Sequence, residues 1–242
     1  MIKKSIRRLL SRFGYVVRHV GQKGGMAGVD LLHDVSVLLG QKRPVVLFDV
    51  GANIGQTIAS FLEMFPDSQI HSFEPSPAPF ETLRNAYGQE ARVHLENLAL
   101  GDQEGALPFH VTNDYSVNDS LLEPVWDAGA KVVSVQVSTL DRYCQQHQVE
   151  SIDHLKIDTQ GFDLQVLRGA SQILKEKRIH SLSVELTFSP MYKNQPSYIE
   201  VLSFLEKSGY QLLGFYEQTY RHNQLVYANA LFVAGSIRES TS

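Results

Sequence analysis

Residues 45–55 read VVLFDVGANIG, an apolar run that ends in an acid and continues at once into two spaced glycines. The apolar character of residues 45–50, interrupted only by Asp49, predicts a strand buried on both faces of a parallel sheet. Gly51 and Gly55 allow a sharp turn and a close approach of the backbone to a ligand. The amphipathic residues 54–65 predict a helix whose N-terminus faces this turn and favours an anionic group. We therefore expect a ligand-binding loop here.

A second acid, Glu74, ends the next short apolar run, 23 residues after Gly51. In nucleotide-binding βαβ units an acid near this offset lies at the end of the neighbouring strand and accepts hydrogen bonds from ribose hydroxyls. The loop departs from the Gly-x-Gly-x-x-Gly pattern of dinucleotide sites, because Asn53 stands at the second glycine position. Asp49 and Glu74 thus predict a nucleoside-sized crevice and disfavour a dinucleotide.

Two further acids, Asp158 and Glu185, end two later apolar runs. Ligands of open α/β sheets bind outside the carboxyl ends of the strands, so we expect Asp49, Glu74, Asp158 and Glu185 to share one rim. Each acid taken alone could instead cap the helix or turn that follows it. Four acids at four strand ends favour a shared site.

The alternation of strands and helices predicts an α/β fold with a doubly wound, mainly parallel sheet. Turn residues at 101–102 and 104–105 predict an excursion whose extended parts are residues 107–111 and 132–137, and a polar segment, residues 216–227, should separate the last two strands. The predicted strands are residues 45–50, 69–74, 92–98, 152–157, 181–186, 210–215 and 228–233. The predicted helices are residues 30–39, 54–65, 77–87, 139–148, 163–177 and 197–207.

Five motifs, in this order, resemble the FkbM family of methyltransferases: residues 49–55 (DVGANIG), 73–75 (FEP), 99–102 (ALGD), 156–161 (KIDTQG) and 166–170 (VLRGA). The resemblance covers about residues 44–234. It implies S-adenosylmethionine as the cofactor and a class I, Rossmann-like methyltransferase fold, a seven-stranded sheet with an antiparallel final strand. Many members of the family carry Val-Glu where this chain has Thr159-Gln160, which removes one candidate acid from the site.

The same resemblance implies roles for the residues of the motifs. Asp49 and the loop from Gly51 to Gly55 would hold the methionine end of the cofactor, Glu74 would take the ribose hydroxyls, and the turn at Ala99-Leu100 would border the adenine. The implied cofactor-binding residues are Asp49, Gly51, Ala52, Asn53, Gly55, Glu74, Pro75, Ala99 and Leu100.

The resemblance also implies methylation of a hydroxyl group on a small-molecule or glycan-related acceptor. Alignment supplies most of the rate of a displacement at a sulfonium, but a hydroxyl must also lose its proton, so a general base is expected. Asp158 and Glu185 are the candidate catalytic residues. Asp158 could instead bind the cofactor's amino group, and Glu185 could orient Tyr192. The polar segment 113–120 suits a polyhydroxylated acceptor and equally a solvated loop.

Two other functions stay open. A non-catalytic methyltransferase-like subunit would bind the cofactor weakly or not at all and act through its N-terminal helix. An NAD(P)-dependent oxidoreductase would use a similar sheet, but Asn53 disfavours it.

Composition places the chain among ordinary globular proteins, since its 242 residues are 43% hydrophobic and 20% charged. Its single cysteine, Cys144, excludes an intrachain disulfide and favours a reducing cytoplasm. No segment reaches the roughly 18 apolar residues that span a bilayer. The nine histidines show no metal-ligand spacing, so no metal is expected, and the basic residues outside the N-terminus are too sparse to favour nucleic acid.

Residues 1–23 contain seven Lys or Arg and no acid, although the whole chain carries a net charge of −4. Apolar residues recur among these bases at helical spacing, which is typical of a helix that lies on an anionic membrane surface. The alternative is a helix that packs on the domain or on the second subunit of a homodimer. We expect residues 1–43 to form a basic amphipathic helical extension and linker, and residues 44–242 to form the methyltransferase domain. Packing is the more common role of such a helix, and residues 1–20 are the segment that a membrane-surface contact would use.

Overall fold

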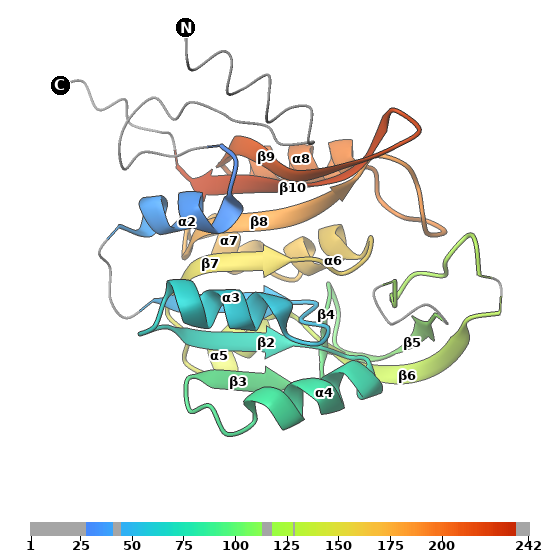
Figure 1. Cartoon of the computed structure of the whole chain (residues 1–242), viewed down its shortest axis with the longest axis horizontal. Coiled ribbons are helices and arrows are strands. Elements are labelled where there is room, and N and C mark those ends of the chain that lie inside the picture. The colour runs from blue at the N-terminus through green and yellow to red at the C-terminus, as the bar shows by residue number, and fades with distance from the viewer. Residues whose placement is uncertain (1–27, 41–44, 113–117, 128, 236–242) are drawn as a thin grey trace, which may run out of the picture.

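A central sheet of seven strands organises the computed structural model of this chain, which describes residues 28–40, 45–112, 118–127 and 129–235 (Figure 1). The strand order is β3-β2-β1-β7-β8-β10-β9. Neighbouring strands pair in parallel, except that β10 runs antiparallel to both β8 and β9. The predicted mainly parallel sheet with an antiparallel final strand is confirmed. The strands are β1 (Val46–Val50), β2 (Gln69–Phe73), β3 (Val93–Glu96), β7 (Ile152–Ile157), β8 (Ile179–Thr187), β9 (Tyr210–Arg221) and β10 (Gln224–Ala234).

Helices cover both faces of this sheet, which explains why β1 is apolar on both sides. Successive side chains of a strand point to opposite faces. Leu47 packs into the core beneath α2, α3 and α4, whereas Phe48 and Val50 pack into the larger core beneath α5, α6, α7 and α8 (Figure 1). The helices are α2 (Leu31–Leu39), α3 (Gln56–Met64), α4 (Pro77–Tyr87), α5 (Leu140–Gln146), α6 (Asp163–Arg168), α7 (Ser171–Lys175) and α8 (Tyr198–Lys207).

A second sheet of three strands forms the predicted excursion between β3 and α5. Its order is β4-β6-β5, and the strands are β4 (Ala99–Leu100), β5 (Gly105–Val111) and β6 (Lys131–Ser138). The extended segments 107–111 and 132–137 expected from the sequence pair here as the antiparallel strands β5 and β6. Ala99-Leu100, expected as a turn, forms β4, which pairs in parallel with β6.

The single helix predicted over residues 163–177 is wrong, because the chain divides it into α6 and α7 at Gly169 and Ala170. Gly169 packs directly on the backbone at Gly101, where a Cβ on Gly169 would lie 1.8 Å from the Gly101 carbonyl oxygen. The Gly169 carbonyl also accepts a hydrogen bond from the Asp141 amide, at 3.0 Å. Tertiary contact with the neighbouring loop therefore fixes the break.

The polar segment 216–227 was expected to separate the last two strands. In the structure it belongs to them and forms the end of a long hairpin. Strands β9 and β10 continue through it and are joined by His222 and Asn223, whose φ angles are +49° and +63°. Two left-handed residues in succession are the requirement of a tight two-residue hairpin turn. Pairing between the two strands, rather than the polarity of their side chains, decides the structure.

The expectations for residues 1–27 lie outside the described residues, and so do the membrane contact and the homodimer contact placed there. Within the described part, α2 begins after its cap Asp30 and packs Leu31 and Val35 into the core beside α3. The division of the chain at residues 43 and 44 stays a prediction. No helix in the described part is long and apolar enough to cross a membrane.

Candidate active site

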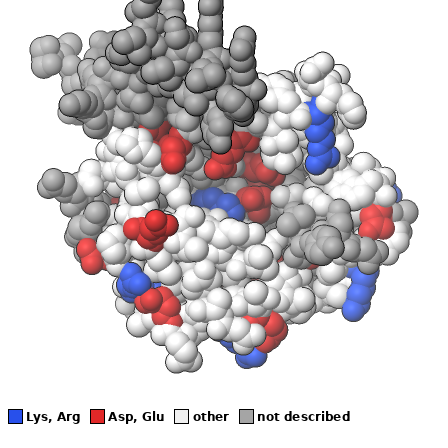
Figure 2. Space-filling view, in the orientation of Figure 1, with Lys and Arg blue, Asp and Glu red and all other residues white. Residues whose placement is uncertain are grey.

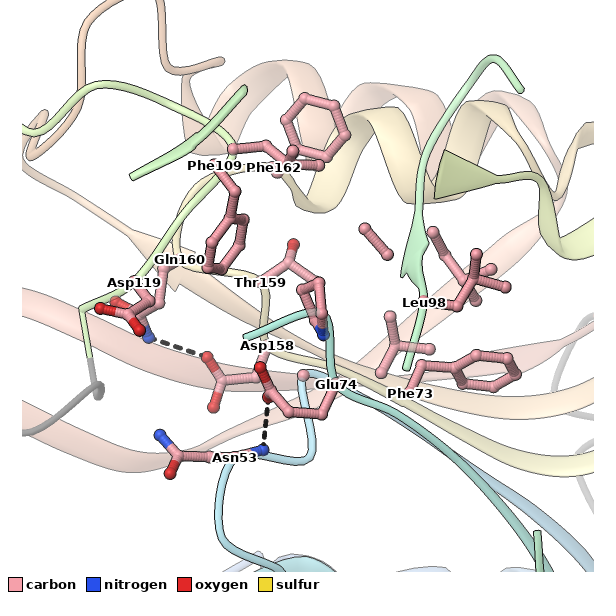
Figure 3. Close-up of a pocket in the computed structure, with 16 residues that line it drawn as sticks. Asn53, Phe73, Glu74, Leu98, Phe109, Asp119, Asp158, Thr159, Gln160 and Phe162 are labelled. Carbon is pink, nitrogen blue, oxygen red and sulfur yellow. Dashed lines mark hydrogen bonds between the residues drawn. The ribbon is translucent and has the colours of Figure 1, made fainter. Parts of the chain in front are cut away.

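An open cavity lies at the carboxyl ends of β1, β2 and β7, and the space within it and at its mouth, open solvent included, is about 600 Å³ (Figure 3). The loop after β1 contributes Gly51 and Asn53, the end of β2 contributes Glu74 and Pro75, and the turn after β7 contributes Asp158. Three of the four strand-end segments singled out by sequence thus meet at one cavity. The position agrees with the general rule for ligand sites in open α/β sheets.

The glycine turn after β1 is held by backbone contacts on both sides. The amides of Gly51 and Ala52 donate to the Phe73 carbonyl oxygen at the end of β2, each at 3.0 Å. Gly51 has a φ of +84°, and a Cβ there would lie 1.9 Å from the Asp158 carbonyl oxygen. Only glycine fits this position, so Gly51 brings the ends of β1, β2 and β7 together.

Gly55 closes the same turn from behind the cavity. Its φ is +96°, and a Cβ there would lie 2.5 Å from the Tyr87 ring and 2.9 Å from Leu83, both on α4. The residue is the N-cap of α3 and provides no side-chain cap. Gly55 therefore shapes the loop without lining the cavity.

Glu74 presents a buried carboxylate at the end of β2. Its Oε2 accepts a hydrogen bond from the Asn53 amide at 2.8 Å, and its Oε1 accepts one from the Ser76 amide at 2.7 Å. The side chain is 6% exposed, and burial raises the pKa of Glu74 to about 7 against the two amide hydrogen bonds, which lower it. The carboxylate is thus fixed in position beside the glycine turn and can accept further hydrogen bonds from a ligand.

An apolar part of the cavity adjoins Glu74. Figure 3 shows Phe73 and Leu98 on one side and Phe109 and Phe162 on another. Ala99 and Leu100 of β4 also line the cavity. An apolar slot next to a fixed carboxylate matches a purine base joined to a ribose, so the residues present fit an adenosyl group.

Lys156 on β7 ties the two strand-end acids Asp49 and Asp158 together. Its Nζ lies 3.1 Å from Asp49 Oδ1, 3.5 Å from Asp158 Oδ2 and 3.1 Å from the Gly51 carbonyl oxygen, to which it donates. Asp49 is completely buried and does not line the cavity, and neither of its oxygens has a well-directed hydrogen bond among the described residues. Asp49 therefore acts on the loop through Lys156, by charge.

Charge and burial oppose each other in this ion pair. Burial raises the pKa of Asp49, and Lys156 lowers it. Burial would lower the pKa of Lys156, but Asp49 and Asp158 outweigh it, so the pKa of Lys156 lies above its ordinary value. Lys156 is accordingly a cation at neutral pH.

Glu185 lies behind Asp158, away from the cavity lining. Gln160 joins the two acids, since its Nε2 donates to Asp158 Oδ1 at 2.9 Å and to Glu185 Oε2 at 3.3 Å. The Tyr192 hydroxyl shares its one proton between the Asn118 carbonyl oxygen, at 3.0 Å, and Gln160 Oε1, at 3.2 Å, rather than donating it to Glu185. Burial, Asp158 and Asp163 raise the pKa of Glu185 well above its ordinary value. Of the two candidate bases, Asp158 is therefore the one that reaches the cavity.

Asp119, at the end of the polar segment 113–120, lines the cavity opposite the sheet. Its Oδ2 accepts from the Ser76 hydroxyl at 3.0 Å, and its Oδ1 accepts from the Thr112 amide at 2.8 Å. Asp119 thus connects the excursion to the end of β2. Residues 113–117 lie outside the described residues.

The predicted site residues divide into two groups. Those that line the cavity are Gly51, Asn53, Glu74, Pro75, Ala99, Leu100 and Asp158, and those that do not are Asp49, Ala52, Gly55 and Glu185. Of the four strand-end acids, Glu74 and Asp158 line the cavity, whereas Asp49 is completely buried beside Lys156 and Glu185 contacts Gln160. The roles expected for these four acids stay predictions. Sequence reasoning missed Phe109, Asp119, Gln160 and Phe162. Only Gln160 carried a signal, as a departure from the family pattern.

The charge of the cavity favours a cationic or neutral ligand. Glu74, Asp119 and Asp158 line it, and no Lys or Arg does so among the described residues. On the face of the molecule seen in Figure 2, acidic side chains lie around a central basic one, which is not part of the cavity lining. Within the part of the chain that the structure describes, no three His, Cys, Asp or Glu side chains form a group that could hold a metal ion.

The strand order, with the antiparallel β10 between β8 and β9, is that of the class I methyltransferases. The model of the Methyltransferase FkbM domain matches residues 49–212. The chain therefore belongs to the FkbM family of S-adenosylmethionine-dependent methyltransferases.

Proteins similar to this chain include two of similar sequence and one solved structure of similar fold. The chain is 27% identical to "2-O-methyltransferase NoeI" of Sinorhizobium fredii over 187 residues, which cover 72% of this chain and 76% of the relative. It is 39% identical to "31-O-demethyl-FK506 methyltransferase FkbM" of Streptomyces tacrolimicus over 61 residues, 25% of this chain and 24% of the relative. The crystal structure of magnesium protoporphyrin IX methyltransferase from Synechocystis is 10% identical, with a TM-score of 0.49 over 83% of this chain and 76% of that one.

Proposed function

We propose that this methyltransferase methylates a hydroxyl group of a small-molecule or glycan-related acceptor. The observation that carries the proposal is the placement of Asp158 on the lining of the same cavity that combines Glu74 with an apolar slot. The names of two relatives, a 2-O-methyltransferase and a 31-O-demethyl-FK506 methyltransferase, support oxygen as the methylated atom.

Glu74 would accept hydrogen bonds from the ribose hydroxyls of S-adenosylmethionine. The walls at Phe73, Leu98 and Leu100 would enclose the adenine. The loop from Gly51 to Asn53, whose three amides donate to Phe73 and Glu74, would border the methionine end, and Asp49 would support that loop through Lys156. The acidic lining suits a ligand that carries an ammonium and a sulfonium.

When bound, the cofactor supplies a methyl group on a sulfonium, and the C–S electron pair stays on sulfur as the acceptor oxygen forms the new C–O bond. The chain must orient the acceptor and remove its proton. Asp158 is positioned to take that proton, because its carboxylate reaches the cavity and its side chain is 32% exposed. Glu185 would act behind it, through Gln160.

Calorimetric titration of the full chain with S-adenosylmethionine and S-adenosylhomocysteine tests the cofactor assignment. We expect micromolar binding by the parent chain and its loss in Glu74→Ala. A nicotinamide dinucleotide should not bind. Methyl transfer from labelled cofactor to a panel of neutral polyols and glycosides then tests the acceptor class, and transfer to an amine or thiol acceptor alone would contradict the proposal.

We also propose the cytoplasm as the compartment and residues 1–20 as a contact to the inner membrane surface or to a second subunit. The buried thiol of Cys144, whose pKa burial raises to about 12, suits a reducing compartment. Sedimentation with anionic liposomes before and after removal of residues 1–20 separates the two contacts. Equal co-sedimentation of both forms would contradict membrane binding.

A further inference from the structure

Gln160 occupies a left-handed backbone position in the turn after β7, with a φ of +53°, and Gly161 follows with a φ of +89°. A residue with a Cβ adopts this conformation only when its surroundings hold it there. The Ser120 hydroxyl donates to the Gln160 carbonyl oxygen at 2.8 Å and fixes the backbone from the excursion side. The turn directs the Gln160 side chain toward the ends of β7 and β8.

The amide of Gln160 is the junction of three polar groups from three parts of the chain. Its Nε2 has two protons, which it donates to Asp158 at 2.9 Å and to Glu185 at 3.3 Å. Its Oε1 lies 3.2 Å from the Tyr192 hydroxyl, whose proton it shares with the Asn118 carbonyl oxygen at 3.0 Å. Figure 3 shows the contact with Asp158 at the edge of the cavity. An amide satisfies two carboxylates without adding charge, which neither an acid nor an apolar side chain can do.

The surroundings of this junction are rich in titratable groups. Asp49 on β1, Asp163 on α6 and Glu185 on β8 are acids close to Asp158, and Lys156 on β7 is the cation that faces them. Burial raises the pKa of Asp163 to about 6, against hydrogen bonds from Thr159. The Gln160 hydrogen bond lowers the pKa of Glu185, which burial and the neighbouring acids raise. The neutral Gln160 amide thus opposes proton uptake by Glu185 at a place where several acids lie close together.

We propose that Gln160 is a positioning residue that orients Asp158 at the point where the methyl group is delivered, and that couples it to Glu185. The inference rests on the proposed function. Asp158 receives the acceptor's proton, and the Gln160 amide holds that carboxylate at the edge of the cavity. A carboxyl at position 160 would place three acids in contact and force them to share a proton.

The test compares how the chain binds two cofactor forms that differ by one charge. S-adenosylmethionine has a sulfonium, and S-adenosylhomocysteine has a neutral thioether at the same place. The ratio of their dissociation constants therefore reports the negative charge that faces the sulfur, while contributions from the ribose end, including Glu74, cancel. Calorimetric titration of the full-length parent, Gln160→Gly and Gln160→Glu between pH 6 and pH 9 gives this ratio as a pH profile.

Gln160→Gly removes the amide and suits the left-handed backbone, so this variant should fold. We expect it to move the midpoint of the profile upward, because Glu185, whose pKa is raised by burial and by neighbouring acids, loses the hydrogen bond that lowers its pKa. Gln160→Glu should move the midpoint further and, at pH 9, raise the preference for the sulfonium about threefold to tenfold above the parent. Gln146→Glu, the same change at an exposed position of α5, should match the parent.

Profiles of Gln160→Gly and Gln160→Glu that superimpose on the parent profile would overturn the inference, since a merely structural Gln160 would change both affinities alike and leave their ratio unchanged. A parent chain that binds neither cofactor form would instead refute the proposed function, and the inference with it.

Discussion

Lys156 Nζ lies 3.1 Å from Asp49 Oδ1, in a pair where the lysine side chain is 17% exposed and the aspartate is completely buried. The contact joins β7 to β1 beneath the glycine turn. It makes Lys156 the counter-charge of an acid that the cavity itself does not expose.

Lys156→Met should destabilise the fold by about 3–5 kcal/mol, because it leaves Asp49 as a buried charge without a partner. Urea denaturation at pH 7.5 measures the change. The loss should shrink as the pH falls, since the pKa of Asp49 is raised in the folded state and protonation removes the unpaired charge.

The double variant Asp49→Asn with Lys156→Met serves as the control. It leaves no completely buried charge without a partner, and only the partly exposed Asp158 loses a cation, so it should recover most of the stability that Lys156→Met loses. If the free energy of unfolding of Lys156→Met lies within about 1 kcal/mol of that of the parent, the buried pair contributes no more than an exposed ion pair.

Glu74 should make cofactor binding depend on pH. Its pKa lies at about 7, so the carboxylate takes up a proton as the pH falls below neutrality. Ribose hydroxyls donate to the ionised form, and we therefore expect the dissociation constant of S-adenosylhomocysteine to rise by up to about tenfold per pH unit below pH 7. Calorimetry between pH 5.5 and pH 8.5 measures it. Glu74→Gln, which does not titrate, should bind more weakly and without this slope.

Substitutions of Asp158 and Glu185 should lower the turnover rate to different extents. Asp158→Asn removes the proton acceptor that reaches the cavity, so the methyl-transfer rate should fall by about 10²-fold to 10⁴-fold. Glu185→Gln keeps a polar group at the Gln160 amide and should cut turnover less, with cofactor affinity nearly unchanged. Single-turnover transfer to an acceptor found in the screen compares them. A larger loss for Glu185→Gln would assign the base role to Glu185.

Gly51→Ala should destabilise the ends of β1 and β7 together. The new Cβ meets the Asp158 carbonyl at 1.9 Å, and the φ of +84° disfavours any side chain. We expect the melting temperature to fall by about 5–10 °C and cofactor binding to be lost. Gly129→Ala is the matched control, because its Cβ would meet only Asp127 Oδ1 at 3.6 Å. Equal melting temperatures for both variants would contradict the close approach.

The parts of the site that sequence predicted are those fixed by strand topology. Gly51, Glu74 and Asp158 follow β1, β2 and β7, and parallel strands bring their carboxyl ends to one edge. Glu185 does not line the cavity, because β8 does not end there: it continues to Thr187, which pairs with Tyr227 of β10. The end of a strand depends on its partner, which the local apolar pattern does not contain.

The parts that sequence missed depend on contacts between distant segments. Lys156 belongs to a recognised motif, but its role follows from Asp49 on another strand. Asp119 lies in a polar segment whose composition equally suits a surface loop, and its bond to Ser76 gives it a place. Gln160 differs from glutamate by one heavy atom, the nitrogen Nε2. The importance of that nitrogen follows from its contacts with two carboxylates, Asp158 and Glu185, which the sequence does not show.

The three strands of the smaller sheet share no backbone pairing with the seven of the larger one. Substitutions in β5 or β6 can therefore reshape the wall at Phe109 and Asp119 without shifting the register of β1 against β7. One side of the cavity is free to diverge while the other keeps its arrangement of turns and acids. For protein engineering, β5 and β6 are therefore the strands that we would vary to seek activity toward a new acceptor.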